Sequence, residues 1–429
     1  MILYIFLGGL ILLFLAGFAV PYAIGIVSLV ALIYEEGFGD IPFTILAQRL
    51  VFGMNSFVLL AIPLFLFAGK LMNLGSITRR IFSFTNLLVG WVPGGLGHVN
   101  VVSSMIFAGM SGSAVADAAG LGTIEVKAMT EEGYDREFSA AITAASSTIG
   151  PIIPPSIPLI MFGVMGNVSI SSLLIGGLVP GVLMGVSLMI MCYYYGKKRN
   201  YPIRKFPTFN EFWAGLKEAF WPLLTPVIMI GGILSGVFTP TEAAGVAVLY
   251  AFILTLVFRE LNLKEFIEIS LQTVKESAII FIIIGMASIY GWLMIRTQMP
   301  QMFVEVIFMI TENPLFILLI LNVFLLIVGM FMESIAAITI LTPLLVPLAI
   351  GVGIDPLHLG LVMVLNLMIG LLTPPVGMCL YAVSRVANIS FDKLVKAVAP
   401  FYIPLFIVLL IITIFPQIVT FLPNLVFGR

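Results

Sequence analysis

Serine, threonine, glycine and proline gather at four interruptions of otherwise apolar stretches. The four segments read Phe107-Ala-Gly-Met-Ser-Gly-Ser-Ala-Val-Ala-Asp117, Ser146-Ser-Thr-Ile-Gly-Pro-Ile-Ile-Pro-Pro-Ser156, Gly329-Met-Phe-Met-Glu-Ser334 and Leu372-Thr-Pro-Pro-Val-Gly377. Glycine and proline break a helix there and leave backbone carbonyl and amide groups unpaired. Carbonyl and hydroxyl oxygens suit a sodium ion, and the amides of a helix N-terminus suit an anion. Two matching pairs of breaks therefore predict two cation sites that flank one anion site.

The stretches around these breaks belong in a membrane. Hydrophobic residues make up 61% of the 429 residues and charged residues only 10%, against about 25% charged in a soluble domain. Inside a bilayer, irregular backbone survives only where protein, water or ligand satisfies it. The unpaired backbone groups at the breaks are thus expected to have partners in protein, water or ligand.

Several other functions are excluded by the same reading. The net charge of −1 gives no basis for nucleic-acid binding, and the two cysteines and two histidines lack metal-ligand spacing, so no transition-metal site is expected. No P-loop or hydrolase motif occurs, which argues against direct ATP drive and against an enzyme. The stretch 1–20 lacks a basic start and a cleavage site, so we expect a retained helix and not a signal peptide.

Apolar length predicts about ten spanning helices and two re-entrant hairpins. The hairpins are 97–127 and 314–350, because each carries breaking or polar residues at its middle. The expected spans are 2–20, 22–34, 51–72, 137–165, 170–196, 223–238, 240–258, 276–296, 356–384 and 399–421, of which 137–165 and 356–384 are broken.

The lysine and arginine residues predict the orientation. With an external N-terminus and two hairpins, all of them face the cytoplasm except Arg49, Arg296 and Arg429. Both termini are then external. The basic run from Lys197 to Lys205 is an orientation signal, with a lipid-headgroup role as the alternative.

The chain contains an internal repeat. A shift of 220 positions aligns 109–155 with 329–375 without a gap, and most of the matched residues are glycine or proline at turns and breaks. The halves are 1–196 and 218–429, joined by a cytoplasmic linker at 197–217. Each half has five spans and one hairpin, so the second half is predicted to sit inverted, which is typical of secondary transporters. A duplicated scaffold without transport is the alternative.

Four acidic residues lie in or near apolar segments, where ionisable groups are costly and usually functional. Asp117 and Glu333 flank the hairpin breaks and suit contact with a coupling ion, proton transfer or helix capping. Glu125 lies in the first hairpin. Glu242 follows Pro240, where Thr239 or Thr241 as an N-cap explains it structurally. Arg296 and Arg385 are more consistent with interfacial snorkelling than with binding a carboxylate.

Four stretches resemble a known family. Gly109–Asp117, Gly150–Ser156, Gly166-Asn-Val-Ser169 and Phe238-Thr-Pro-Thr-Glu-Ala-Ala244 are similar to signature segments of the large membrane subunit of tripartite ATP-independent periplasmic (TRAP) transporters. The resemblance implies an elevator mechanism, in which a domain holding the hairpins and broken helices moves against a scaffold. It also implies a small membrane subunit of about four helices, a periplasmic substrate-binding protein and sodium-coupled import of organic acids such as C4-dicarboxylates, sialic acid or sulfonates.

The resemblance also implies the ligands of the coupling ions. The first sodium site would use Ser111, Gly112, Ser113, Ser147, Thr148 and Gly150, and the second Gly329, Ser334, Thr339, Thr373, Pro374 and Gly377. Taken singly, such Ser and Thr residues are also explained as packing contacts between helices. Substrate contacts are expected from Ser113, Asp117, Pro155, Ser156, Glu333 and Pro375.

Together these features predict an all-α polytopic membrane protein of the bacterial cytoplasmic membrane, with sodium as coupling ion and no organic cofactor. Its expected role is the large subunit of a binding-protein-dependent importer of an organic anion. A stand-alone sodium/dicarboxylate symporter is the nearest rival. An ion channel or structural membrane scaffold is the rival of another class.

Overall fold

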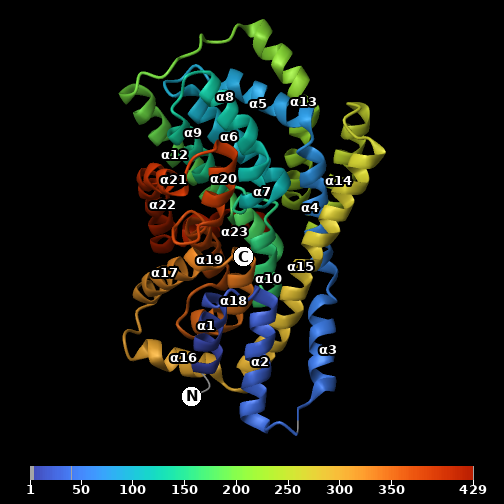
Figure 1. The fold of residues 1–429 in the computed structure, drawn as a ribbon, viewed down its shortest axis with the longest axis vertical. Coiled ribbons are helices and arrows are strands. Elements are labelled where there is room, and N and C mark those ends of the chain that lie inside the picture. The colour runs from blue at the N-terminus through green and yellow to red at the C-terminus, as the bar shows by residue number, and fades with distance from the viewer. Residues whose placement is uncertain (1–3, 40, 429) are drawn as a thin grey trace.

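The computed structural model describes residues 4–39 and 41–428, and in these ranges the chain is helical with no strand (Figure 1). Up to the linker, the elements are η1 (Tyr4–Gly8), α1 (Gly9–Leu15), α2 (Val20–Glu36), α3 (Phe43–Met54), η2 (Phe57–Leu60), α4 (Ala61–Met72), α5 (Gly75–Val89), α6 (Gly95–Ser111), α7 (Ala114–Ala119), α8 (Leu121–Glu131), α9 (Arg136–Ser147), α10 (Ile157–Gly166), α11 (Ile170–Gly176) and α12 (Leu178–Lys198).

After the linker, the chain continues in eleven further α-helices and one short 3-10 turn. These are α13 (Phe209–Leu234), α14 (Pro240–Val257), α15 (Leu263–Arg296), α16 (Met299–Phe308), α17 (Pro314–Phe331), α18 (Ser334–Gly351), α19 (Pro356–Gly370), α20 (Met378–Ala387), α21 (Phe391–Val398), η3 (Ala399–Phe401), α22 (Tyr402–Ile414) and α23 (Gln417–Phe427).

Seven helices among the described residues are long and apolar enough to cross a membrane, or eight if a bent pair counts as one span. That pair is α3 with η2 and α4, which meet at 54°. The fold is therefore that of an all-α polytopic membrane protein. The predicted spans 137–165 and 356–384 each consist of two shorter helices, with non-helical breaks at 148–156 and 371–377.

Several predicted bounds are wrong because apolar length alone set them. The helices at the predicted spans 223–238 and 276–296 begin at Phe209 and Leu263, well before those spans start, and the first of them ends at Leu234. Both begin at a capping box, in which Thr208 pairs with Glu211 and Asn262 with Glu265. Hydrogen bonds of the cap extend a helix into polar sequence that a hydropathy window leaves out.

Two charged residues have structural roles. Glu242 completes a capping box with Thr239 at the start of α14, so the capping explanation is confirmed and Thr239 is the N-cap residue.

Arg296 forms an ion pair with Glu36 at the end of α2 and lies over the Trp292 ring. The expectation of simple snorkelling for Arg296 is wrong, because an acidic partner from a distant helix neutralises it.

The helices form two groups that meet where α15 packs on α18 and where α4 packs on α6. On one side, α15 packs along α2, α3 and α4, and α14 packs along α4. We call α2, α3, α4, α14 and α15 the wall; its helices form one edge of the molecule (Figure 1). On the other side lie α6 to α12 and α17 to α23, where α10 packs on α18 and α17 packs on α19.

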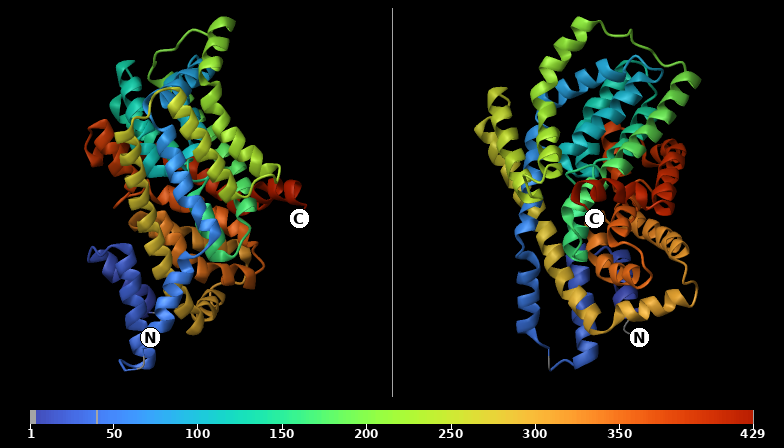
Figure 2. Two further views of the ribbon diagram at one scale, coloured as in Figure 1. Left: turned by 90° about the vertical axis from the view of Figure 1, so that its right-hand side faces the viewer. Right: turned by 180° about the vertical axis from the view of Figure 1, so that it is seen from behind.

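The stretch between α12 and α13 arches over one end of the molecule (Figure 2). Its non-helical part is 199–208, which is shorter than the predicted linker 197–217 because the flanking helices extend into it. Arg199 pairs with Asp135, and Arg204 pairs with Glu132, both on the α8–α9 connection. The Tyr201 ring also stacks on Tyr134, with 4.2 Å between ring centroids. The linker is thus fastened to the first half.

Candidate functional site

The first hairpin breaks where α6 ends and α7 begins. Gly112 has a φ of +60°, a left-handed conformation that favours glycine, and Ser113 then caps α7 by accepting a hydrogen bond from the Ala116 amide. A Cβ on Gly112 would lie 2.6 Å from the carbonyl oxygen of Pro155. The absence of a side chain therefore lets the hairpin break lie against the break in the following span.

The second hairpin breaks at Met332–Glu333, between α17 and α18. The Glu333 carboxylate caps α18, accepting hydrogen bonds from the Ala336 amide at 3.2 Å and the Ser334 hydroxyl at 3.0 Å. The Val376 amide donates to the Met330 carbonyl oxygen across 3.3 Å. The second hairpin break therefore lies against the break that separates α19 from α20, as the first does against the break before α10.

Three of the four interrupted segments line one cavity of about 550 Å³, and the fourth borders it through Leu371 and Met378 on either side. Its volume lies within the range of small-molecule sites, about 300–1,000 Å³. The wall closes its other side with residues of α4, α15 and the start of α2. The lining consists of Ala19, Val20, Pro21, Leu66, Gly112, Ser113, Ala114, Val115, Pro151, Ile157, Pro158, Glu276, Ile279, Ile280, Ile283, Glu333, Ser334, Ile335, Ala336, Leu371 and Met378.

The residues predicted for the first sodium site gather behind this cavity. Ser147 and Thr148 are buried, and their hydroxyls donate to the carbonyl oxygens of Ala144 and Ala145 at 2.9 and 2.6 Å. Each hydroxyl oxygen keeps a lone pair for another partner. Gly150 lies near the Ser113 carbonyl oxygen, 3.9 Å from where its Cβ would be. Gly112 and Ser113 line the cavity. The backbone of Ser111 ends α6, but its side chain lies outside the described part of the chain.

The residues predicted for the second sodium site are more spread out. Gly329 lies on α17 against Gly370 at the end of α19. Thr373 lies in the break before α20, and its hydroxyl donates to the Ile369 carbonyl oxygen at 2.8 Å. Gly377 begins α20 with a φ of +55°, two residues after the Pro374–Pro375 bond, which is cis. Ser334 lines the cavity, whereas Thr339 is buried more than one helical turn further along α18.

Two of the six residues predicted to touch substrate line the cavity, Ser113 and Glu333. The others, Asp117, Pro155, Ser156 and Pro375, do not. Asp117 is buried on α7, and Ser156 is buried and caps α10 by accepting from the Leu159 amide. These four residues lie at or near the breaks in the sequence, but proximity to a break does not place a side chain in the cavity.

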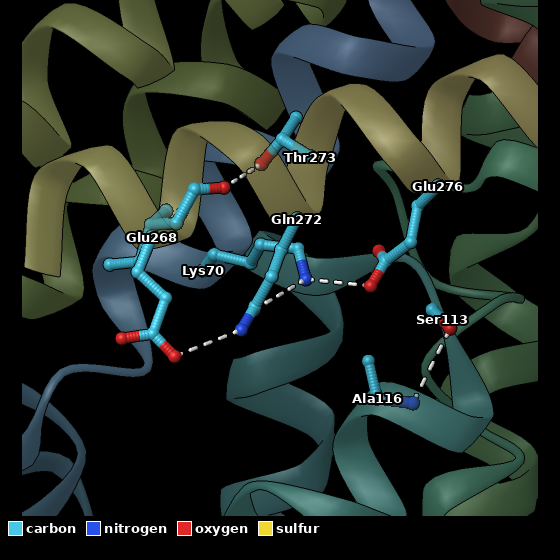
Figure 3. A network of polar contacts seen from close by, with 8 residues as sticks. Lys70, Ser113, Ala116, Glu268, Gln272, Thr273 and Glu276 are labelled. Atoms are coloured by element: carbon cyan, nitrogen blue, oxygen red, sulfur yellow. Dashed lines mark hydrogen bonds and ion pairs between the residues drawn. The ribbon is translucent and has the colours of Figure 1, made fainter.

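The sequence reading missed Glu276 and Lys70. Glu276 lines the cavity from α15, and its carboxylate lies 2.8 Å from the Lys70 ammonium on α4. Figure 3 shows Lys70 between Gln272 and Glu276, with Ser113 of the first hairpin break in the same view. Glu276 stood at the edge of the expected span 276–296, but the helix begins 13 residues earlier. Glu276 could have been predicted from the sequence because it is a charged residue next to a long apolar stretch.

Buried amide and hydroxyl pairs hold the hairpins against the broken spans. In the first half, Asn100 on α6 donates to Thr143 on α9 at 2.7 Å and accepts from Ser146 at 2.7 Å. In the second half, Asn366 on α19 donates to Asn322 on α17 at 2.9 Å. Such interhelical hydrogen bonds fix helix positions in a membrane protein. They therefore hold the helices on the side of the cavity opposite the wall in place.

A helical membrane protein whose broken helices surround an internal cavity has the architecture of a solute transporter. The model of one family, described as tripartite ATP-independent periplasmic transporter, DctM component, matches residues 7–418. The chain belongs to this family and is a transport subunit, not an enzyme.

Relatives with different cargo share most of this chain. The sialic acid TRAP transporter large permease protein SiaM of Vibrio cholerae is 48% identical, with 96% of each chain covered. The C4-dicarboxylate TRAP transporter large permease protein DctM of Pseudomonas aeruginosa is 38% identical, with 88% of this chain and 89% of the relative covered.

The fold is also that of a solved transporter. The crystal structure of Alcanivorax borkumensis YdaH matches with a TM-score of 0.58 at 14% identity, covering 89% of this chain and 88% of that one. At this identity the match concerns the fold alone.

Proposed function

We propose that the chain is the large membrane subunit of a sodium-coupled, binding-protein-dependent importer of an organic anion. One observation carries the proposal: three interrupted segments, far apart in the sequence, line a single cavity, and Leu371 and Met378 on either side of the fourth line it too. Family membership supports the transport role.

The helix N-termini at the cavity favour an anionic cargo. Helices α10, α18 and α20 each have ten residues or more, and each begins at a lining residue or next to one. Their N-terminal ends carry a partial positive charge, and the amides that Ser156 and Glu333 do not cap remain as donors. A carboxylate or sulfonate group of the cargo would accept from these amides.

The charges of the lining support coupling to a cation. Among the described residues that line the cavity, Glu276 and Glu333 are acidic and none is Lys or Arg. An anion entering beside two carboxylates is repelled unless cations accompany it. Sodium ions bound by the hydroxyl and carbonyl oxygens at the breaks would supply that charge, so cargo and sodium would bind together.

An elevator mechanism with inverted repeats fits the two-group packing. The wall would stay fixed in the bacterial cytoplasmic membrane, and the group that holds both hairpins and both broken helices would carry the cavity across. Both termini would lie in the periplasm. The glycine contacts and amide pairs between hairpins and broken spans support movement of that group as one body.

Two partners complete the proposal. A small membrane subunit of about four helices would cover part of the wall, where α3 has no buried residue and exposes Phe43, Ile45, Val51 and Phe52. A periplasmic binding protein would deliver the cargo. Sialic acid and C4-dicarboxylates are the first classes to test, because relatives at 48% and 38% identity carry these names.

Reconstitution in proteoliposomes tests the proposal. The chain with its small subunit should take up radiolabelled sialic acid or succinate only with an inward sodium gradient and the binding protein present. Equal uptake without the binding protein would identify a stand-alone symporter. Current without saturable uptake of either anion would identify a channel.

A further inference from the structure

We propose that Lys70, on the wall, is a cargo-contacting residue that determines specificity for anions and shares its ammonium between Glu276 and an anionic group of the cargo. The inference rests on the proposed function, organic-anion transport. It starts from the ion pair between Lys70 Nζ and Glu276 Oε1, 2.8 Å apart, at a carboxylate that lines the cavity.

The ammonium has a donor to spare. Lys70 donates to Glu276 at 2.8 Å and makes a longer contact of 3.5 Å with the Gln272 side-chain oxygen. An ammonium carries three N–H donors. The third is therefore free for a carboxylate that enters beside Glu276. The pair is also accessible, with the Lys70 side chain 21% exposed and the Glu276 side chain 49% exposed.

The position of Lys70 follows from the spacing on α15. Glu268, Gln272 and Glu276 lie four residues apart, on one face of the helix, and Gln272 contacts the Glu268 carboxylate at 3.5 Å (Figure 3). This row holds Gln272 and Glu276 on the side of α15 that faces α4. The Lys70 side chain is thus held beside Glu276, whose side chain lines the cavity.

The acidic lining of the cavity is the reason to expect that the Lys70 ammonium contacts the cargo. The two lining carboxylates are satisfied differently: Glu333 caps α18 within its own segment, whereas Glu276 has Lys70 as its basic partner. An anion next to Glu276 would otherwise face an unscreened like charge. One ammonium can bridge two carboxylates. Lys70 therefore lets an anionic group of the cargo bind beside the Glu276 carboxylate.

Uptake kinetics of Lys70 and Glu276 variants test the inference in the reconstituted complex, with sialic acid and succinate as probes. Lys70→Met should raise KM by about tenfold or more, as expected for loss of a charge-assisted hydrogen bond, with a smaller effect on the maximal rate. Lys70→Arg should recover most of the affinity. Glu276→Gln should lower KM, because the ammonium is then free for the cargo.

The double variant separates a cargo contact from a purely structural ion pair. Lys70→Met with Glu276→Gln should keep the raised KM, because the cation is still missing. Restoration of the wild-type KM in the double variant would overturn the inference, as would an unchanged KM in Lys70→Met. Lys127→Met is the matched control, since Lys127 pairs with Glu131 on an exposed face.

The outcomes distinguish this inference from the proposed function. If the wild-type complex imports neither anion, both fail. If it imports one with sodium and the binding protein, but the variants do not follow the expected order, only the role of Lys70 fails. Size-exclusion profiles identify a variant that does not fold. Glu276→Gln then decides: a structural pair predicts impaired uptake, and a cargo contact predicts a lowered KM.

Discussion

Gly329 on α17 and Gly370 at the end of α19 lie in backbone contact. A Cβ on Gly370 would be 2.6 Å from the Gly329 Cα and 2.7 Å from its carbonyl carbon. No rotamer change relieves a clash with backbone, so the second hairpin and the second broken span can approach this closely only through glycine.

Gly370→Ala should therefore separate the hairpin from the broken span. We expect a destabilisation of about 1–3 kcal/mol, typical of overpacking, and loss of most uptake. Thermal unfolding in detergent and proteoliposome uptake measure the two effects. Gly245→Ala is the matched control, because that helical glycine has open space around its Cβ position. Equal behaviour of the two variants would contradict the packing argument.

Removing hydroxyls at the first break should weaken the response to sodium. Ser113→Ala and Thr148→Ala are each expected to raise the sodium concentration for half-maximal uptake several-fold, about the effect of one hydrogen bond or ligand. Ser187→Ala is the control, because its hydroxyl, like that of Thr148, donates to a backbone carbonyl oxygen, that of Met184 on α12 at 2.8 Å. Unchanged sodium activation in both variants would remove these two residues from the ligand set.

A sodium gradient should drive uptake and a proton gradient should not. Oxygen ligands without net charge at the breaks suit a sodium ion, and we expect a proton or a lithium ion to be a poor substitute for it. Uptake into vesicles with each gradient imposed alone provides the measurement. Full uptake on a proton gradient in sodium-free buffer would instead identify Asp117 or Glu333 as proton carriers.

The orientation can be checked by cysteine labelling. Cys192 and Cys379 are buried, so they should give little background with a maleimide that does not cross membranes. Glu312→Cys, in the exposed α16–α17 connection, should react in intact cells once the outer membrane is permeable. Lys205→Cys, in the exposed linker, should react only after the cytoplasmic membrane is opened. The reverse pattern would invert the topology.

The linker contact should depend on pH. The Tyr201 hydroxyl, 2.7 Å from Asp135, and then the Arg199 guanidinium hold the pKa of Asp135 below its ordinary value of 3.8. Because the folded pKa is lowered, the stabilisation is full above the ordinary value and is lost as the pH falls through the lowered one. Asp135 is exposed, so the effect is at most about 1 kcal/mol.

Tyr201→Phe keeps the ring that stacks on Tyr134 and removes the hydroxyl. We expect a lower unfolding temperature than wild type at pH 7 and a smaller difference near pH 3, with Tyr22→Phe, an exposed ring, as control. A difference that stays constant with pH would show that the hydroxyl acts through packing and not through Asp135.

The sequence located the breaks well, because glycine and proline act within a few residues of their position. Gly112, Ser113 and Glu333 lie where α7 and α18 begin, and the breaks before α10 and α20 fall inside the expected spans. Helix starts in polar sequence were located poorly. Thr208 and Asn262 begin helices by capping, a local hydrogen-bond pattern that a search for apolar length ignores.

The amino-acid sequence alone determined that this is a polytopic helical membrane protein, because burial of apolar side chains in lipid depends on composition and length. It also determined where helices break, because backbone preferences are local. Only the tertiary structure decided which groups meet: Lys70 and Glu276 are 206 residues apart, and Gly329 touches Gly370. Such pairs follow from the packing of whole helices against one another, which no short segment of sequence specifies.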